Sequence, residues 1–246
     1  MSGEDLDACT GYRPDFPYHD ENHQMLAWYA GRLAETLRAR GARRVVSLGI
    51  GHTVVTRRLL ELVRSGVSAY AIVEGSRERI AELRSAVELP AGVELHHGYF
   101  EDYTPSDPVD VVEMGFVLEH VADPEALVAR YREFLAPGGL LAIAVPNARS
   151  LHRLVGQRAG LLDDLYKLSE ADLALGHRRY FDKDSLVRMV EGAGLRVLAC
   201  EGILLKCLTT AQLARLALEP RVKQAFCELG AGFPDIANAI YLEAAR

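Results

Sequence analysis

Histidines beside acids are the side chains in this sequence best suited to acid–base chemistry. His120 directly follows Glu119, and His177 opens the segment His-Arg-Arg-Tyr-Phe. An imidazole titrates near neutral pH, so it can take a proton from an acceptor hydroxyl. We therefore expect His177 and His120 to be catalytic, while a structural hydrogen bond near a helix start remains the alternative for His120.

A glycine turn after an apolar run predicts a ligand-binding loop. The stretch Val45 to Thr53 reads VVSLGIGHT and places Gly49 and Gly51 directly before an expected helix. Such a backbone can approach a ligand closely while the helix N–H groups point at it. Glu74, at the end of the next expected strand, could accept hydrogen bonds from both ribose hydroxyls of a cofactor. The dinucleotide fingerprint needs a third glycine where Val54 stands, which disfavours a nicotinamide-dependent oxidoreductase.

These residues require a scaffold, and the hydrophobic pattern predicts an α/β fold. Near-continuous apolar strands alternate with helical segments after Gly41, which indicates a parallel sheet covered on both faces. Ligands of such sheets bind beyond the carboxyl ends of the strands. The expected strands cover 44–48, 68–73, 92–96, 109–114 and 140–145, and the helices between them cover 53–65, 76–88 and 123–135.

Two insertions and an N-terminal helix depart from this alternation. The helix is expected at 20–40, and its polar start at 18–23 is either a solvated helix end or a lid over a ligand. Residues 147–180 are too long for an ordinary connection and predict a cap with helical pieces at 150–158 and 160–175. The expected organisation is a lid segment and helix at 1–42, a cofactor-binding core at 43–146, the cap at 147–180, and the rest of the core at 181–246. This last part is expected to contain a helix at 182–192, a strand at 195–203, a second insertion near 206–233 and a last strand at 237–244.

Composition narrows the classes of function. The 246 residues carry a formal net charge of −6 and 49% hydrophobic residues, which is typical of a globular chain and disfavours a nucleic-acid partner. The four cysteines lack metal-type spacing. No apolar run approaches the roughly 20 residues of a membrane span, and the N-terminus is polar rather than signal-like. We expect a cytoplasmic protein with no membrane partner.

Several later elements resemble one enzyme family. They are GYFED at Gly98–Asp102, GFVLEHVADPEAL at Gly115–Leu127 and FLAPGGLLAIAVPN at Phe134–Asn147. With the glycine turn and AIVEGS at Ala71–Ser76, they resemble the class I S-adenosylmethionine-dependent methyltransferases over roughly residues 43 to 200. The branch looks similar to ubiquinone-biosynthesis O-methyltransferases. The resemblance implies a Rossmann-like, seven-stranded, mostly parallel sheet with an antiparallel last strand and helices on both faces.

The resemblance also implies a binding site for S-adenosyl-L-methionine. The residues that it assigns to the cofactor are Ser47, Gly49, Gly51, Glu74, Gly75, Ser76, Phe100, Glu101 and Gly115. Two positions depart from the family pattern. Ser47 stands where the family usually has an acid, and so lacks the charge that attracts the cofactor's ammonium group. Thr53 stands where the loop usually has its third glycine, which suggests a different loop or a helix N-cap.

The function implied is methyl transfer to a small, anionic metabolite in bacterial natural-product or sugar metabolism, with O-transfer favoured over N-transfer. The cap is rich in basic residues, so Tyr18, Arg149, His152, Arg178 and Arg179 are the expected substrate residues. No metal is expected, because Phe116 stands where metal-binding relatives have their first acid. A non-catalytic cofactor-binding scaffold stays the alternative beside the oxidoreductase, and a homodimer is left open.

Overall fold

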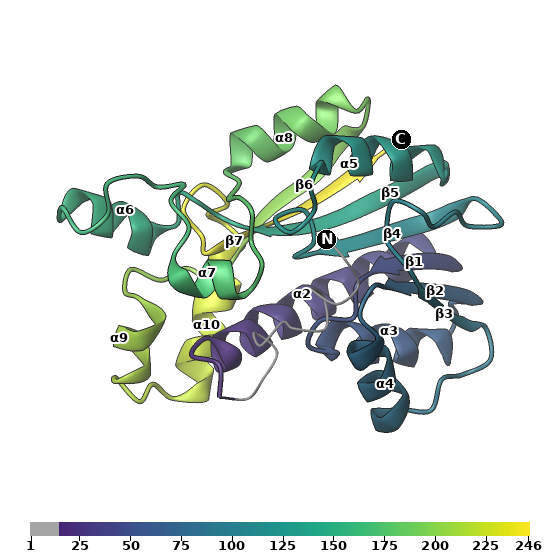
Figure 1. Cartoon of the computed structure of the whole chain (residues 1–246), viewed down its shortest axis with the longest axis horizontal. Coiled ribbons are helices and arrows are strands. Elements are labelled where there is room, and N and C mark those ends of the chain that lie inside the picture. Colours follow the sequence, from purple (N-terminus) through teal and green to yellow (C-terminus); the bar gives the residue numbers. More distant parts are fainter. Residues whose placement is uncertain (1–14) are drawn as a thin grey trace.

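The structure is a computed structural model that describes residues 15–246, so the first 14 residues of the expected lid segment lie outside the described residues. Within that range, seven strands form one sheet in the order β3-β2-β1-β4-β5-β7-β6 (Figure 1). The strands are β1 (Arg44–Leu48), β2 (Ala69–Glu74), β3 (Val93–His97), β4 (Val109–Gly115), β5 (Leu135–Pro146), β6 (Arg196–Ile203) and β7 (Ala239–Ala245).

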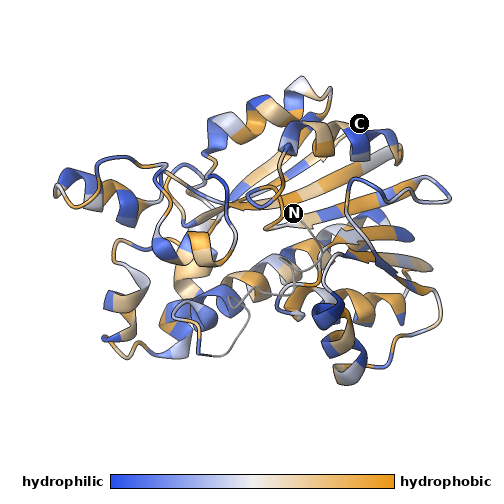
Figure 2. Ribbon diagram, in the orientation of Figure 1, coloured by the Kyte–Doolittle hydropathy of each residue, from blue (hydrophilic) through white to orange (hydrophobic). Residues whose placement is uncertain are grey.

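The strand pairing confirms the expected sheet. The pairs β1–β2, β1–β4, β2–β3 and β4–β5 are parallel. The last strand, β7, runs antiparallel to both of its neighbours, β5 and β6. Figure 2 shows these strands as a predominantly hydrophobic centre, as expected of a sheet with both faces covered.

Helices cover both faces of the sheet. One face packs against α2 (His19–Arg40), α3 (Val54–Val63), α4 (Arg77–Ala86) and α10 (Pro220–Gly230). The other face packs against α5 (Pro124–Glu133) and α8 (Lys183–Gly192). The remaining helices, α6 (Leu151–Arg158), α7 (Glu170–Ala174) and α9 (Thr210–Ala214), lie beyond the carboxyl ends of the parallel strands (Figure 1).

Helix α2 matters most for the site because it crosses from the core to that edge. Met25, Tyr29, Leu33 and Leu37 recur at helical spacing and are buried. The helix ends at Gly41, whose φ of 61° is left-handed and whose N–H bonds to the last-turn carbonyls. No helix among residues 15–246 is long and apolar enough to cross a membrane.

The cap departs from the sequence prediction. Helix α6 lies where the first helical piece is expected, but the second, expected at 160–175, shrinks to α7 at Glu170–Ala174. Local side-chain bonds explain the difference: the Asp164 carboxylate accepts from the Tyr166 N–H, and Ser169 forms a capping box with Asp172 that starts α7 late. Residues 160–169 are therefore an irregular segment that leads into the short helix.

Candidate functional site

One continuous cavity of about 790 Å³ lies beyond the carboxyl ends of the parallel strands. Its walls come from the start of α2, the loops after β1, β2 and β4, and the cap. The core end is lined by the glycine turn, and the cap end by residues of both insertions. A small cofactor and a small acceptor can therefore lie side by side in the same space.

The glycine turn forms the floor of the core end. Gly49 and Gly51 have φ of 87° and 53°, in the left-handed region that favours glycine. A Cβ on Gly49 would stand 3.9 Å from Phe100 Cζ, so the turn and this ring are close neighbours in the cavity lining. The turn is thus open to a ligand at the backbone, as the sequence predicts.

Glu74 is fixed to that turn by the backbone. One carboxylate oxygen accepts from the Ile50 N–H and the other from the Ser76 N–H, each at 2.8 Å. Burial raises the pKa of Glu74, and these bonds oppose the rise. Each carboxylate oxygen keeps further acceptor capacity toward the cavity.

Other expected cofactor residues lie close by. Gly75, Ser76, Glu101 and Gly115 line the cavity. A Cβ on Gly115 would come within 2.4 Å of the Tyr29 ring, so no larger residue fits there without a shift.

Ser47 departs from its expected role. It is buried, lies outside the cavity lining, and accepts a hydrogen bond of 3.0 Å from Tyr70. Its register partner on β4 is Glu113, which does line the cavity. The Glu113 carboxylate accepts from the Gly115 N–H at 2.7 Å and from the Tyr29 hydroxyl at 2.9 Å. Burial raises the pKa of Glu113 to about 7.

Thr53 is the N-cap of α3 by position, but its side chain makes no capping bond. Its φ is 59°, a left-handed conformation that is costly for a β-branched residue. Thr53 therefore adopts the backbone conformation that a glycine would take at this position of the turn.

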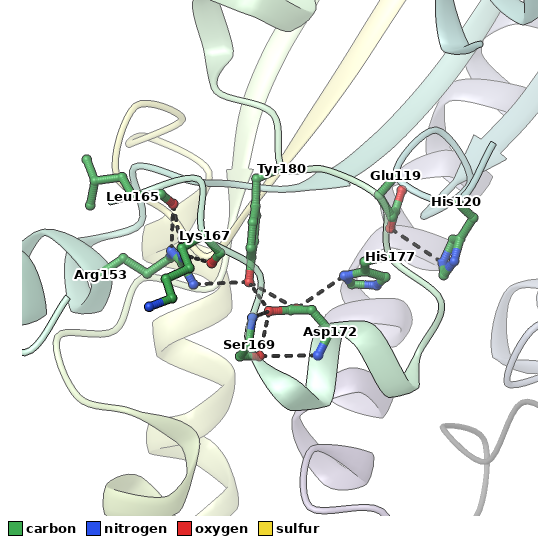
Figure 3. Close-up of polar contacts among 9 residues, drawn as sticks. All are labelled: Glu119, His120, Arg153, Leu165, Lys167, Ser169, Asp172, His177 and Tyr180. Carbon is green, nitrogen blue, oxygen red and sulfur yellow. Dashed lines mark hydrogen bonds and ion pairs between the residues drawn. The ribbon is translucent and has the colours of Figure 1, made fainter. Parts of the chain in front are cut away.

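A chain of polar contacts holds the cap end of the cavity (Figure 3). Arg153 donates to the carbonyls of Leu165 and Lys167 and to the Tyr180 hydroxyl. Tyr180 in turn donates to the Asp172 carboxylate at 2.9 and 3.0 Å. These contacts connect Asp172, through Tyr180, to the Arg153 side chain of α6.

Asp172 connects that chain to His177. His177 Nδ1 lies 3.2 Å from Asp172 Oδ1. The pKa of Asp172 is held at about 2, because the neighbouring His177 ring and hydrogen bonds from Ser169 outweigh the burial that would raise it. The histidine therefore lies beside a charged carboxylate, an arrangement typical of acid–base groups.

Glu119 and His120 complete the group. The rings of His120 and His177 meet edge to face at 4.8 Å, and His120 Nε2 lies 4.0 Å from Glu119 Oε1. Neither Glu119 carboxylate oxygen has a hydrogen-bond partner among the described residues, although the side chain is fully buried. Burial raises the pKa of Glu119 to about 7 and lowers that of His120 to about 3. Such unpartnered buried groups are expected where a ligand or water binds.

The same three residues could hold a metal ion. One ligand atom from each of Glu119, His120 and His177 lies within 4.8 Å of the other two. Phe116, whose φ is 59°, also lines the cavity and offers no ligand atom. The absence of a metal stays a prediction.

The structure divides the five expected substrate residues. Tyr18, His152 and Arg178 line the cavity. Arg149 lies outside the lining, and so does Arg179, which donates to the carbonyls of Leu118, Val121 and Ala122. Arg179 therefore supports the turn before α5, and a substrate role for Arg149 and Arg179 stays a prediction from the sequence.

Sequence reasoning missed three residues. Asp172 and Arg153 act through contacts that only the folded cap creates. Glu113 carried a visible signal, since a lone acid inside the apolar run VDVVEM is unusual in a buried strand.

Comparisons with known proteins agree with this geometry. A family model described as a methyltransferase domain matches residues 19–199. A ubiquinone biosynthesis O-methyltransferase of Cupriavidus pinatubonensis is 26% identical over 192 residues, which cover 76% of this chain and 72% of that protein.

Two solved structures share the fold. An S-adenosylmethionine-dependent methyltransferase from Mesorhizobium loti has a TM-score of 0.60 and 20% identity, over 86% of this chain and 96% of that one. The N-methyltransferase NodS from Bradyrhizobium japonicum, in complex with S-adenosyl-L-homocysteine, has a TM-score of 0.59 and 11% identity, over 100% and 96%. With the matched family model and the glycine turn facing the cavity, they lead to one conclusion: this chain belongs to the methyltransferase-domain family and is an S-adenosylmethionine-dependent methyltransferase.

Proposed function

We propose that this enzyme methylates a hydroxyl group of a small, anionic metabolite. The observation that carries the proposal is the continuity of the cavity from the glycine turn to the buried, unpartnered Glu119 carboxylate beside His120 and His177. A hydroxyl gains most from a base, whereas an amine need only reach the site neutral. Base-type groups at the acceptor end therefore favour O-transfer.

His177 is the proposed base. The cofactor supplies a methyl group bound to a sulfonium, which is ready for in-line displacement. The protein orients the acceptor and excludes water from the cavity. As the acceptor oxygen bonds to the methyl carbon, the carbon–sulfur bond breaks and His177 takes the hydroxyl proton on Nε2. Asp172, 3.2 Å from Nδ1, favours the tautomer that leaves Nε2 free and stabilises the charge that forms.

The preference for an anionic acceptor rests on Arg178. Its side chain is exposed and lines the cavity next to the proposed base. The other cations at this end are already committed: Arg153 to carbonyls of the cap, and the buried Lys206 to Glu21 and Thr210. Arg178 is thus the guanidinium best placed to bind a carboxylate or phosphate.

Glu113 is the proposed partner of the cofactor's ammonium group. The family's usual acid is missing from β1, where Ser47 stands, and Glu113 brings a carboxylate to the adjacent strand at the same register. It lines the core end of the cavity and accepts a hydrogen bond from the Gly115 N–H. An ammonium nearby would favour the ionised carboxylate over the neutral acid that burial favours.

The test is a screen of acceptor metabolites with isotopically labelled methyl donor, followed by mass spectrometry and NMR of the product. A label on oxygen in an acidic acceptor, with activity kept in the presence of a chelator, supports the proposal. A label on nitrogen, or tight donor binding without turnover on any acceptor, would contradict it. Natural-product or sugar metabolism and a homodimer stay predictions from the sequence.

A further inference from the structure

A second histidine group lies outside the proposed chemistry, where α2 meets the glycine turn. His19 and His23 are four residues apart on α2, so their side chains share one face of its first turns. His52 directly follows Gly51 in the turn and lines the cavity. Segments far apart in the chain thus bring three imidazoles together.

The spacing of these rings matches a shared ligand. The ring centroids lie 4.2 Å apart for His19 and His23, 4.9 Å for His23 and His52, and 5.7 Å for His19 and His52. One nitrogen from each ring lies within 4.8 Å of the other two. Zinc binds histidine nitrogen at roughly 2.0–2.1 Å, so small side-chain rotations would bring all three nitrogens onto one ion.

The surroundings of the three histidines allow an ion to enter from solvent, and they include a carboxylate that could orient one of the rings. All three histidines are partly exposed. The Asp20 carboxylate lies 3.4 Å from His19 Nδ1, as the outer carboxylate partner of a ligating histidine would. Three protein nitrogens would leave one position of a tetrahedral ion for water.

We propose that His19, His23 and His52 form a binding site for a divalent transition-metal ion, with Zn²⁺ as the expected occupant. The ion joins the start of α2 to the glycine turn of the cofactor site. Tyr18, Glu21 and Asn22, which flank the histidines, line the same cavity. Bound metal therefore fixes one wall of the cofactor site, stabilises the protein and slows release of the cofactor.

The test is titration of Zn²⁺ into untagged, chelator-dialysed protein, followed by calorimetry. We expect the wild type to bind one ion per chain. His23→Ala and His52→Ala should lose this ion, or bind it more weakly by more than the roughly 10–100-fold that loss of an outer-shell partner typically causes. His120→Ala is the matched control, because it removes a ligand from the other possible metal group and should keep this ion. Thermal unfolding gives a second readout: Zn²⁺ should raise the midpoint of the wild type and of His120→Ala, but not of His23→Ala.

Two results would overturn the site. One is the same zinc affinity in the wild type, His23→Ala and His52→Ala, and the other is no binding of Zn²⁺ to the wild type. Zinc lost only in His120→Ala would likewise place the ion at Glu119 and refute this site. Equal unfolding midpoints of wild type and variants in chelator exclude misfolding as the cause of a loss, and a variant that fails this check is replaced by His52→Gln.

Discussion

Ser47 on β1 and Glu113 on β4 are register partners in adjacent parallel strands, and Glu113 alone of the two reaches the cavity. In our proposal, the carboxylate expected on the first strand is supplied by Glu113 on its neighbour. Because Tyr29 and the Gly115 N–H hold one of its oxygens, the carboxylate has a fixed direction. This relationship leads to the first prediction.

Glu113→Gln should weaken binding of S-adenosylhomocysteine by about tenfold, or about 1.4 kcal/mol. The lost interaction is that between the carboxylate and the ligand's ammonium group. Methylthioadenosine lacks the amino-acid part, so its affinity should be the same for both proteins. Calorimetry with the two ligands makes the comparison, and equal losses for both would mean that the substitution has disturbed the whole site.

The same residue predicts a pH dependence. The pKa of Glu113, raised by burial to about 7, means that the free protein holds the neutral acid below that pH. Affinity for S-adenosylhomocysteine should therefore rise as the pH increases through about 7, and the rise should be absent in Glu113→Gln. Glu119→Gln is the control, since Glu119 titrates in the same range but lies at the cap end.

Thr53→Gly should stabilise the protein by about 1 kcal/mol, because glycine adopts the left-handed conformation without the cost that a side chain incurs. The threonine side chain makes only a long contact of 3.4 Å with Arg57. Urea unfolding measures the change, with Thr53→Ala as the control that removes the same hydroxyl but keeps a Cβ. A glycine variant no more stable than the alanine variant would show that the backbone stores no strain there.

Arg178 and Arg179 are adjacent but should respond differently to substitution. Arg178→Gln should raise the acceptor KM with little change in the unfolding midpoint, because its exposed side chain lines the cavity. Arg179→Gln should instead lower the midpoint, since it leaves the carbonyls of Leu118, Val121 and Ala122 without their donor. Steady-state kinetics and thermal unfolding of both variants separate the two roles, and an unchanged KM in Arg178→Gln would remove the anion-binding assignment.

These two arginines also show what the sequence could not provide. Alternating apolar strands and helices were enough to predict the parallel sheet and the cavity edge, because periodicity reports burial, whereas the antiparallel last strand was expected only from the resemblance to the methyltransferase family. Whether Arg178 or Arg179 faces the cavity depends on the backbone conformation of the irregular segment that leads from the cap back to the core, and hydrophobic periodicity does not report that conformation. The link between Asp172 and His177 likewise depends on where α7 begins, which a capping box set ten residues later than expected.

Asp172→Asn should lower kcat more than it changes the acceptor KM, because the amide no longer stabilises a charged His177. The pKa of Asp172, held at about 2 because His177 and the hydrogen bonds from Ser169 outweigh burial, also predicts the stability profile. A depressed carboxyl pKa contributes stability above its unfolded value of 3.8, and that contribution is lost as the pH falls toward 2. The stability difference between wild type and Asp172→Asn should therefore shrink over this window; a constant difference would contradict the charged state.

The most direct test of the proposed function is His177→Ala, measured with the acceptor that the screen identifies. Loss of a general base predicts a fall in kcat of roughly 10²–10⁴-fold. Calorimetric affinity for S-adenosylhomocysteine should stay at the wild-type value, because His177 lies at the cap end of the cavity. A wild-type kcat in His177→Ala would contradict base-assisted transfer to a hydroxyl.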